Sequence, residues 1–207
     1  LGGNSLSPKG SAGSIAEQFS LARKTMNNLS EFIDLNYNIC ITHGNGPQVG
    51  DELLRMDLTS ETVPPLSLGI CVANTQGQIG YMVQQTLQNE LREKSVDREV
   101  VTLVTQVIVD KNDQSINNPT KFIGPRYTKS EIEKFATKLG WSIKEQEPGS
   151  WRRVVPSPMP EFIMHGKSIK ALVDRGTIVI AFGGGGIPVF NNKDNKIEGL
   201  DAVIDKD

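Results

Sequence analysis

Several features that mark other classes of protein are scarce or missing in this sequence of 207 residues. No apolar run approaches the roughly 20 residues that a helix needs to span a bilayer, so we expect no membrane partner. The net charge of −2 gives no reason to expect a nucleic-acid partner. Only two cysteines occur, Cys40 and Cys71, and they fit no metal spacing. We expect both to be buried, reduced thiols in a cytoplasmic protein.

Common catalytic signatures are also missing. The chain has no Walker A sequence GK[ST], no G-x-G-x-x-G after a strand, and no G-x-S-x-G nucleophile elbow. The two histidines, His43 and His165, have no cysteine or carboxylate at ligand spacing, so we expect no protein-bound metal. His43 adjoins a glycine loop, where a hydrogen-bonding role is conceivable but a general-base role has no support.

The most informative segment is ITHGNGPQVG, residues 41–50. An apolar strand, predicted over 38–42, leads into Gly44, Asn45 and Gly46, and Pro47 then suits the first turn of a helix. The free N–H groups and positive dipole at a helix start attract anions. We therefore predict a phosphate or carboxylate site at the carboxyl end of this strand.

Two further glycine turns follow predicted strands, one at the start of the chain and one at residues 183–186. Turns at the carboxyl ends of strands in one parallel sheet can converge on a common ligand. We interpret them as phosphate-binding or nucleotide-binding turns, with ordinary tight turns as the alternative. The glycines concerned are Gly2, Gly3, Gly44, Gly46, Gly183, Gly184, Gly185 and Gly186.

Helical and strand patterns alternate along the chain, which predicts an α/β fold with a mainly parallel sheet covered on both faces. A polar, turn-rich stretch predicts a protruding lid subdomain over 110–150, inserted into a core formed by 1–109 and 151–207. Both ends of the chain resemble the interior of a longer protein. We predict helices over 15–35, 47–54, 68–91, 129–139 and 162–174, and strands over 38–42, 100–109, 177–182 and 203–204.

Charged candidates are ambiguous on chemistry alone. Lys121 reads as a solvated lysine, and we interpret Arg152 and Arg153 as partners in structural ion pairs rather than an anion site. Lys206 and Asp207 follow an apolar stretch at the end of the chain. Such a pair is usually solvated, although a lysine beside a carboxylate can also neutralise a transferring phosphoryl group.

Taken together, seven motifs resemble those of the carbamate kinases, a family of the amino-acid kinase superfamily. They occur in the family's order over essentially the whole chain, and WRRVVPSP with THGNGPQVG separates this family from its relatives. The segments are LGGN at 1–4, THGNGPQVG at 42–50, QGQIGY at 76–81, NPTK at 118–121 with Gly124-Pro125, WRRVVPSP at 151–158, GGGGIPV at 183–189 and AVIDKD at 202–207.

The resemblance implies a three-layer αβα sandwich, a homodimer, and reversible phosphoryl transfer between ATP and carbamate. It implies Mg²⁺ with ATP or ADP as substrate, and formation of ATP from carbamoyl phosphate and ADP in the arginine deiminase pathway. Lys121 would reach in from the lid, Lys206 would contact the phosphates, and Asp207 would orient the lysines. The residues implied to cradle the phosphoryl group and carbamate are Gly2, Gly3, Asn4, Gly44, Asn45 and Gly46.

The sequence departs from the family pattern at a few points. Phe122 stands where the family usually has proline, Leu200-Asp201 replaces a Val-Glu pair, and the C-terminal part of a family member is missing. Two alternatives stay open. One is another amino-acid kinase, acting on a carboxylate or a nucleoside monophosphate. The other is an inactive remnant that binds carbamoyl phosphate or a protein partner.

Overall fold

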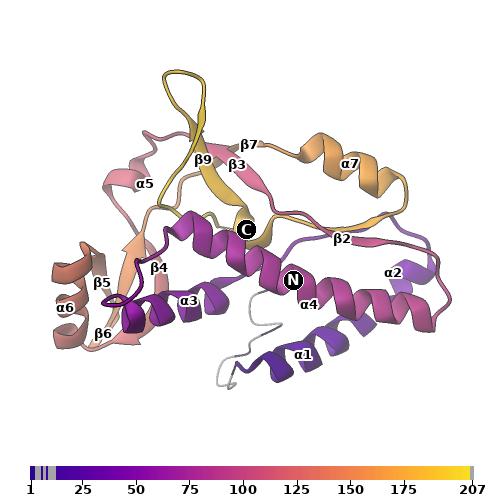
Figure 1. The fold of residues 1–207 in the computed structure, drawn as a ribbon, viewed down its shortest axis with the longest axis horizontal. Helices are drawn as coiled ribbons and strands as arrows, with labels where there is room; N and C mark the ends of the chain where they lie inside the picture. The colour runs from indigo at the N-terminus through magenta and orange to yellow at the C-terminus, as the bar shows by residue number, and fades with distance from the viewer. Residues whose placement is uncertain (3–5, 7, 9–12, 206–207) are drawn as a thin grey trace.

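The computed structural model of the chain describes residues 1–2, 6, 8 and 13–205. Gly3, Asn4, Lys206 and Asp207 lie outside the described residues, so their predicted roles stay predictions. Helix α4 (Leu68–Glu93) runs lengthwise through the molecule (Figure 1). The strands form three small sheets, and α4 packs against two of them. The α/β fold with a parallel sheet is therefore confirmed.

The central sheet has the order β1-β8-β2, and both of its pairings are parallel. Alternate residues of β8 face opposite layers, because side chains alternate along a strand. Ile178 and Ile180 pack with α4 and with α1 (Ile15–Asn27), whereas Val179 packs with α7 (Gly166–Asp174). Helices therefore cover both faces, as predicted. The strands are β1 (Cys40–Ile41), β2 (Val100–Thr102) and β8 (Ile178–Ile180).

The predicted strand over 100–109 is in fact two strands in different sheets. Its second half, β3, pairs with β9 in parallel and with β7 antiparallel. The break lies at Thr105, whose N–H donates to Gln76 Oε1 (2.8 Å) and whose carbonyl accepts from Gln76 Nε2 (3.3 Å). A side chain of α4 thus occupies the Thr105 N–H, while the Thr105 carbonyl also accepts from the Ile187 N–H of β9 (2.9 Å). The second sheet contains β3 (Gln106–Val109), β7 (Pro160–Ile163), β9 (Ile187–Asn191) and β10 (Ile197–Gly199).

The third sheet, of order β4-β6-β5, belongs to the polar insert and lies with α6 at one end of the molecule (Figure 1). The expectation that the chain is back in the core at Trp151 is wrong, because β6 pairs antiparallel with both β4 and β5. The division into a core and a lid domain itself stays a prediction. The insert contains α5 (Gln114–Asn117), β4 (Lys121–Tyr127), α6 (Lys129–Leu139), β5 (Ser142–Glu147) and β6 (Ser150–Val155).

Helix predictions differ from the structure mainly at their ends. The helix predicted over 15–35 is two helices, α1 and the short α2 (Ser30–Asp34). The helix predicted over 162–174 begins only at Gly166, because Phe162 belongs to strand β7 and pairs with Ile108 of β3. Residues 201–205 form no strand. The long helix α4, the helix after residue 46 and α6 are confirmed, the last with the predicted bounds.

Two of the four buried clusters in the described part of the chain join the largest number of elements. The larger packs α1 and α4 against β1, β2 and β8, and the second joins α3 (Gly46–Thr59) and the start of α4 to Ile123 and Val155 of the insert. Cys71 is buried as expected, but Cys40, in the edge strand β1, is exposed, so the expectation for Cys40 is wrong. Within the described part of the chain, no helix is long and apolar enough to cross a membrane.

Candidate functional site

A pocket of about 450 Å³ opens between the carboxyl ends of β1 and β8 and the insert. Three of its walls come from segments far apart in the sequence: the loop after β1, the start of β4, and the last described residues. Several of the predicted site residues meet here. The pocket is lined by Gly2, Gly44, Asn45, Gly46, Pro47, Val49, Lys121, Phe122, Ile123, Arg152, Gly184, Val203, Ile204 and Asp205.

The loop after β1 presents the start of α3 to the pocket. Helix α3 begins at Gly46, with Pro47 in its first turn, as predicted. The side chain of Asn45 does not cap this helix, and instead its Nδ2 donates to Thr75 Oγ1 (2.9 Å) of α4. The first backbone N–H groups of a helix have no acceptor within the helix. They therefore give this wall of the pocket its capacity to bind an anion.

The glycine turn at 183–186 lies mostly behind the pocket, and only Gly184 lines it. The N–H groups of Gly184, Gly185 and Gly186 donate to His43, Phe182 and Gly183 carbonyls at 2.8, 2.9 and 3.2 Å. These three donors are thus used within the protein. The predicted nucleotide-binding role of Gly183, Gly184, Gly185 and Gly186 stays a prediction.

Close packing explains why these positions are glycine. A Cβ on Gly183 would lie 2.5 Å from His43 Cε1, and one on Gly184 would lie 2.5 Å from Asn45 Oδ1. A Cβ on Gly185 would lie 2.6 Å from Ile204 Cγ2. Gly184, Gly185 and Gly186 also have positive φ, which side chains disfavour. The turn therefore lets β8 approach the loop after β1 closely.

His43 connects the two loops and does not line the pocket. It is only 1% exposed, its carbonyl accepts from Gly184 N–H (2.8 Å), and its Nδ1 lies 3.2 Å from the Gly44 carbonyl. Burial lowers the pKa of His43 to about 4, so the ring is neutral at pH 7. The hydrogen bonds of His43 are therefore structural, because they connect the two loops.

Lys121 begins β4 and reaches across the pocket to Asp205, with which it forms an ion pair. Both side chains are partly exposed, at 34% and 57%. Among the described residues that line the pocket, Asp205 is the sole carboxylate. Its place could not be read from the sequence, because an aspartate at the end of an apolar stretch is usually solvated.

The two neighbouring arginines of β6 point to opposite sides of the insert. Arg153 lies 3.8 Å from Asp201 and 5.0 Å above the Trp141 ring, which confirms the expected ion pair. Arg152 lines the pocket and makes no such pair with any described residue, so that part of the expectation is wrong. Strand alternation, which turns successive side chains to opposite faces, was the signal that could have separated them.

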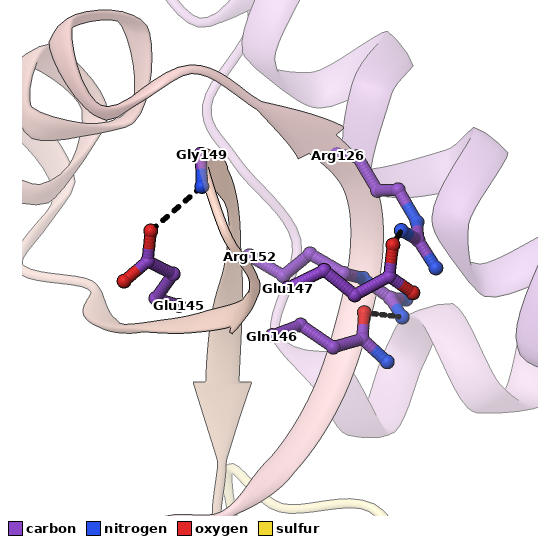
Figure 2. A network of polar contacts seen from close by, with 6 residues as sticks. All are labelled: Arg126, Glu145, Gln146, Glu147, Gly149 and Arg152. Carbon is purple, nitrogen blue, oxygen red and sulfur yellow. Dashed lines mark hydrogen bonds and ion pairs between the residues drawn. The ribbon is translucent and has the colours of Figure 1, made fainter.

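Arg152 is held by neighbouring strands of the insert (Figure 2). Its Nε and Nη2 donate to the Gly124 carbonyl at 3.1 and 2.8 Å, and its Nη1 donates to Gln146 Oε1 at 3.2 Å. Its guanidinium lies 6.0 Å from the Phe122 ring. On the next strand, Arg126 pairs with Glu147 at 2.7 Å. The pocket thus has two cations from the insert, Lys121 and Arg152.

No cluster of three or more His, Cys, Asp or Glu able to hold a metal ion occurs in the part of the chain that the structure describes. A magnesium ion bound mainly by substrate phosphates needs only one or two carboxylates from a protein. Asp205 at the pocket wall is chemically suited to that smaller contribution.

Comparison with known proteins places this arrangement in a family. A carbamate kinase of Pyrococcus furiosus is 49% identical over 209 residues, covering 100% of this chain and 66% of that protein. A structure of carbamate kinase from Giardia lamblia thiocarbamoylated by disulfiram is 36% identical, with a TM-score of 0.89, and the alignment covers 100% of this chain and 67% of that one. This chain belongs to the carbamate kinase family.

The likeness extends to the fold, over the part of each relative that this chain covers. A structure of the Giardia lamblia enzyme bound to AMP-PNP is 36% identical, has a TM-score of 0.89, and is covered to 65% by this chain. The family's amino-acid kinase fold, predicted above, is thereby confirmed. The chain spans 66% of the length of the curated relatives it matches. No family model matches it.

Proposed function

We propose that the protein is a carbamate kinase, which transfers a phosphoryl group reversibly between ATP and carbamate. The observation that carries the proposal is the pocket at the carboxyl ends of β1 and β8. It combines the first turn of α3 with Lys121 and Arg152, a surrounding of donors and cations that suits an anionic phosphoryl group. Carbamate kinases among the relatives, at 49% and 47% identity, support the same activity.

The residues around the pocket would stabilise the reaction electrostatically. Negative charge on the transferring oxygens increases in a loose transition state, and positioned donors and cations stabilise it without a covalent enzyme intermediate. Gly2, Gly44, Asn45 and Gly46 form the wall that would receive the phosphoryl group or carbamate. Lys121 would leave Asp205 for the phosphoryl oxygens as the ligand binds.

Mg²⁺ would enter with ATP or ADP and neutralise charge on the phosphates. Asp205 is the pocket carboxylate that would help to hold it, and this same carboxylate is the partner of Lys121. We further propose a homodimer in the cytoplasm that makes ATP from carbamoyl phosphate and ADP during arginine catabolism. These finer statements rest on the family resemblance.

Turnover by the purified chain tests the proposal. We expect ATP to form from carbamoyl phosphate and Mg-ADP, and Lys121→Ala to lower the rate about 100-fold because it removes charge stabilisation. The exposed ion pair contributes little to folding, so the free energy of unfolding should change by less than about 1 kcal/mol.

Lys138→Ala is the matched control. Lys138 is also a lysine of the insert and is ion-paired to Glu61 at 3.2 Å, but it does not line the pocket. Its removal should leave the rate unchanged. Equal rates for Lys121→Ala and Lys138→Ala would contradict the role of this pocket, and a folded chain without any turnover would contradict the activity.

A further inference from the structure

The two cations of the pocket differ in how their charge is balanced. Lys121 is paired with the carboxylate of Asp205. The hydrogen bonds of Arg152 go to two neutral groups, the carbonyl of Gly124 and the amide of Gln146. No salt bridge between described residues includes Arg152. Among the described residues, the pocket therefore contains one cation that is paired with a carboxylate and one that is not.

The environment of Arg152 makes its charge costly without an anion. Arg152 is partly buried, and burial together with the nearby Arg126 lowers its pKa. A guanidinium still remains charged at neutral pH. Glu147, an acid of this network, is directed to Arg126 and bonds it at 2.7 Å (Figure 2). A negative group in the pocket would offset the unfavourable burial of the Arg152 charge.

The guanidinium of Arg152 is also fixed in place. Its two hydrogen bonds to the Gly124 carbonyl tie it to a point where β4 is irregular and where the φ of Gly124 is +70°. Gly124 itself packs against α3, since a Cβ on Gly50 would lie 3.6 Å from Gly124 Cα. Nη1 and Nη2 each carry a further N–H. Arg152 thus lines the pocket with a guanidinium that these bonds hold in one orientation.

We propose that Arg152 is a phosphoryl-binding residue of this pocket, in which its charge holds the anion directly. The inference rests on the proposed function and adds a residue to its site. The ligand would be a tetrahedral phosphate dianion. Lys121 and Arg152 come from the insert and the first N–H groups of α3 come from the loop after β1, which suits oxygens that point in different directions, and guanidinium donors match phosphate geometry.

Binding of inorganic phosphate to the purified chain, measured by calorimetry, tests this inference without turnover. Arg152→Gln retains a donor but no charge, and we expect it to weaken binding about tenfold. Arg152→Lys retains the charge but not the planar fork of donors, so it should bind phosphate more weakly than wild type and more tightly than Arg152→Gln. Arg175→Gln is the control, an exposed arginine at the end of α7 that does not line the pocket, and it should bind as wild type does.

Other outcomes would overturn the inference. These are the absence of phosphate binding by the wild-type chain, wild-type affinity in Arg152→Gln, or an equal loss in both Arg152 variants. The last result would show that Arg152 acts only by supporting Gly124. Should the variants fail to fold, the Nε–H resonance of Arg152 in the wild-type chain must still shift and saturate as phosphate is added, and a constant resonance overturns the proposal.

The same experiment separates this inference from the proposed function. Phosphate binding that depends on the Arg152 charge, in a chain that makes no ATP, would support the inference and contradict the carbamate kinase activity. ATP formation at an unchanged rate and KM in Arg152→Gln would support the activity and overturn the inference.

Discussion

The loop at 44–46 and the turn at 183–186 follow neighbouring parallel strands, and both are rich in glycine. They differ in what surrounds them. A Cβ on Gly46 would meet nothing within 4 Å, whereas one on any residue of the 183–186 turn would lie within 3.0 Å of another side chain. The first loop leaves room in front of a helix start. The second uses glycine to pack β8 against its neighbours, so glycine-rich turns in one sheet need not share a task.

The largest effect on stability should come from Gly184→Ala. Its Cβ would overlap the Asn45 amide, and its φ of +64° is unfavourable for alanine. Overpacking and backbone strain together should lower the free energy of unfolding by about 4 kcal/mol. Urea denaturation measures this change. An effect below about 1 kcal/mol would show that the turn is not tightly packed.

A smaller effect should appear with pH at His43, which connects the two loops. Its pKa falls from an ordinary 6.5 to about 4 through burial, so between these values the unfolded chain binds the proton that the folded chain excludes. The free energy of unfolding should therefore decrease as the pH falls from about 6.5 to about 4, by about 3 kcal/mol at most. Denaturation at a series of pH values measures it.

His43→Gln should remove that part of the pH dependence, and His165→Gln, at the start of α7, should keep it. If both variants follow the wild-type curve, the junction between the two loops does not exclude a proton at His43.

The smallest stability effect should come from Gly46→Ala. Gly46 is the first residue of α3, and alanine restricts the unfolded chain without meeting a neighbour. The free energy of unfolding should rise by less than about 1 kcal/mol. Phosphate affinity should fall, because the added methyl group enters the pocket wall. If Gly46→Ala instead lost stability and kept its phosphate affinity, the loop at 44–46 would serve packing rather than the ligand, and our distinction between the two glycine turns would be wrong.

Local patterns predicted much of this fold, and contacts between distant segments account for the rest. The apolar spacing of α4 and the Thr128 capping box of α6 are local, and both helices were predictable. The division of residues 100–109 depends on Gln76, whose bonds to Thr105 cross 29 positions in sequence. No periodicity in either segment encodes such a contact.

The candidate site was likewise predictable only where a local sequence pattern marked it. The anion loop at 44–46 was predictable from glycine, proline and the preceding strand. Lys121 stood out only through the family resemblance, since a lone lysine in a polar insert carries no signal of its own. Arg152 was grouped with Arg153 because no strand was predicted over these residues, so the alternation that turns them to opposite faces was not considered. Its true position in β6 sends only Arg152 to the pocket.

A crystal structure of the chain with bound AMP-PNP and Mg²⁺ tests the central claim most directly. The account predicts that the terminal phosphate lies against the first turn of α3, with Lys121 moved from Asp205 to a phosphate oxygen and Arg152 within hydrogen-bond distance. A terminal phosphate bound outside this pocket, with Lys121 still paired to Asp205, would contradict it.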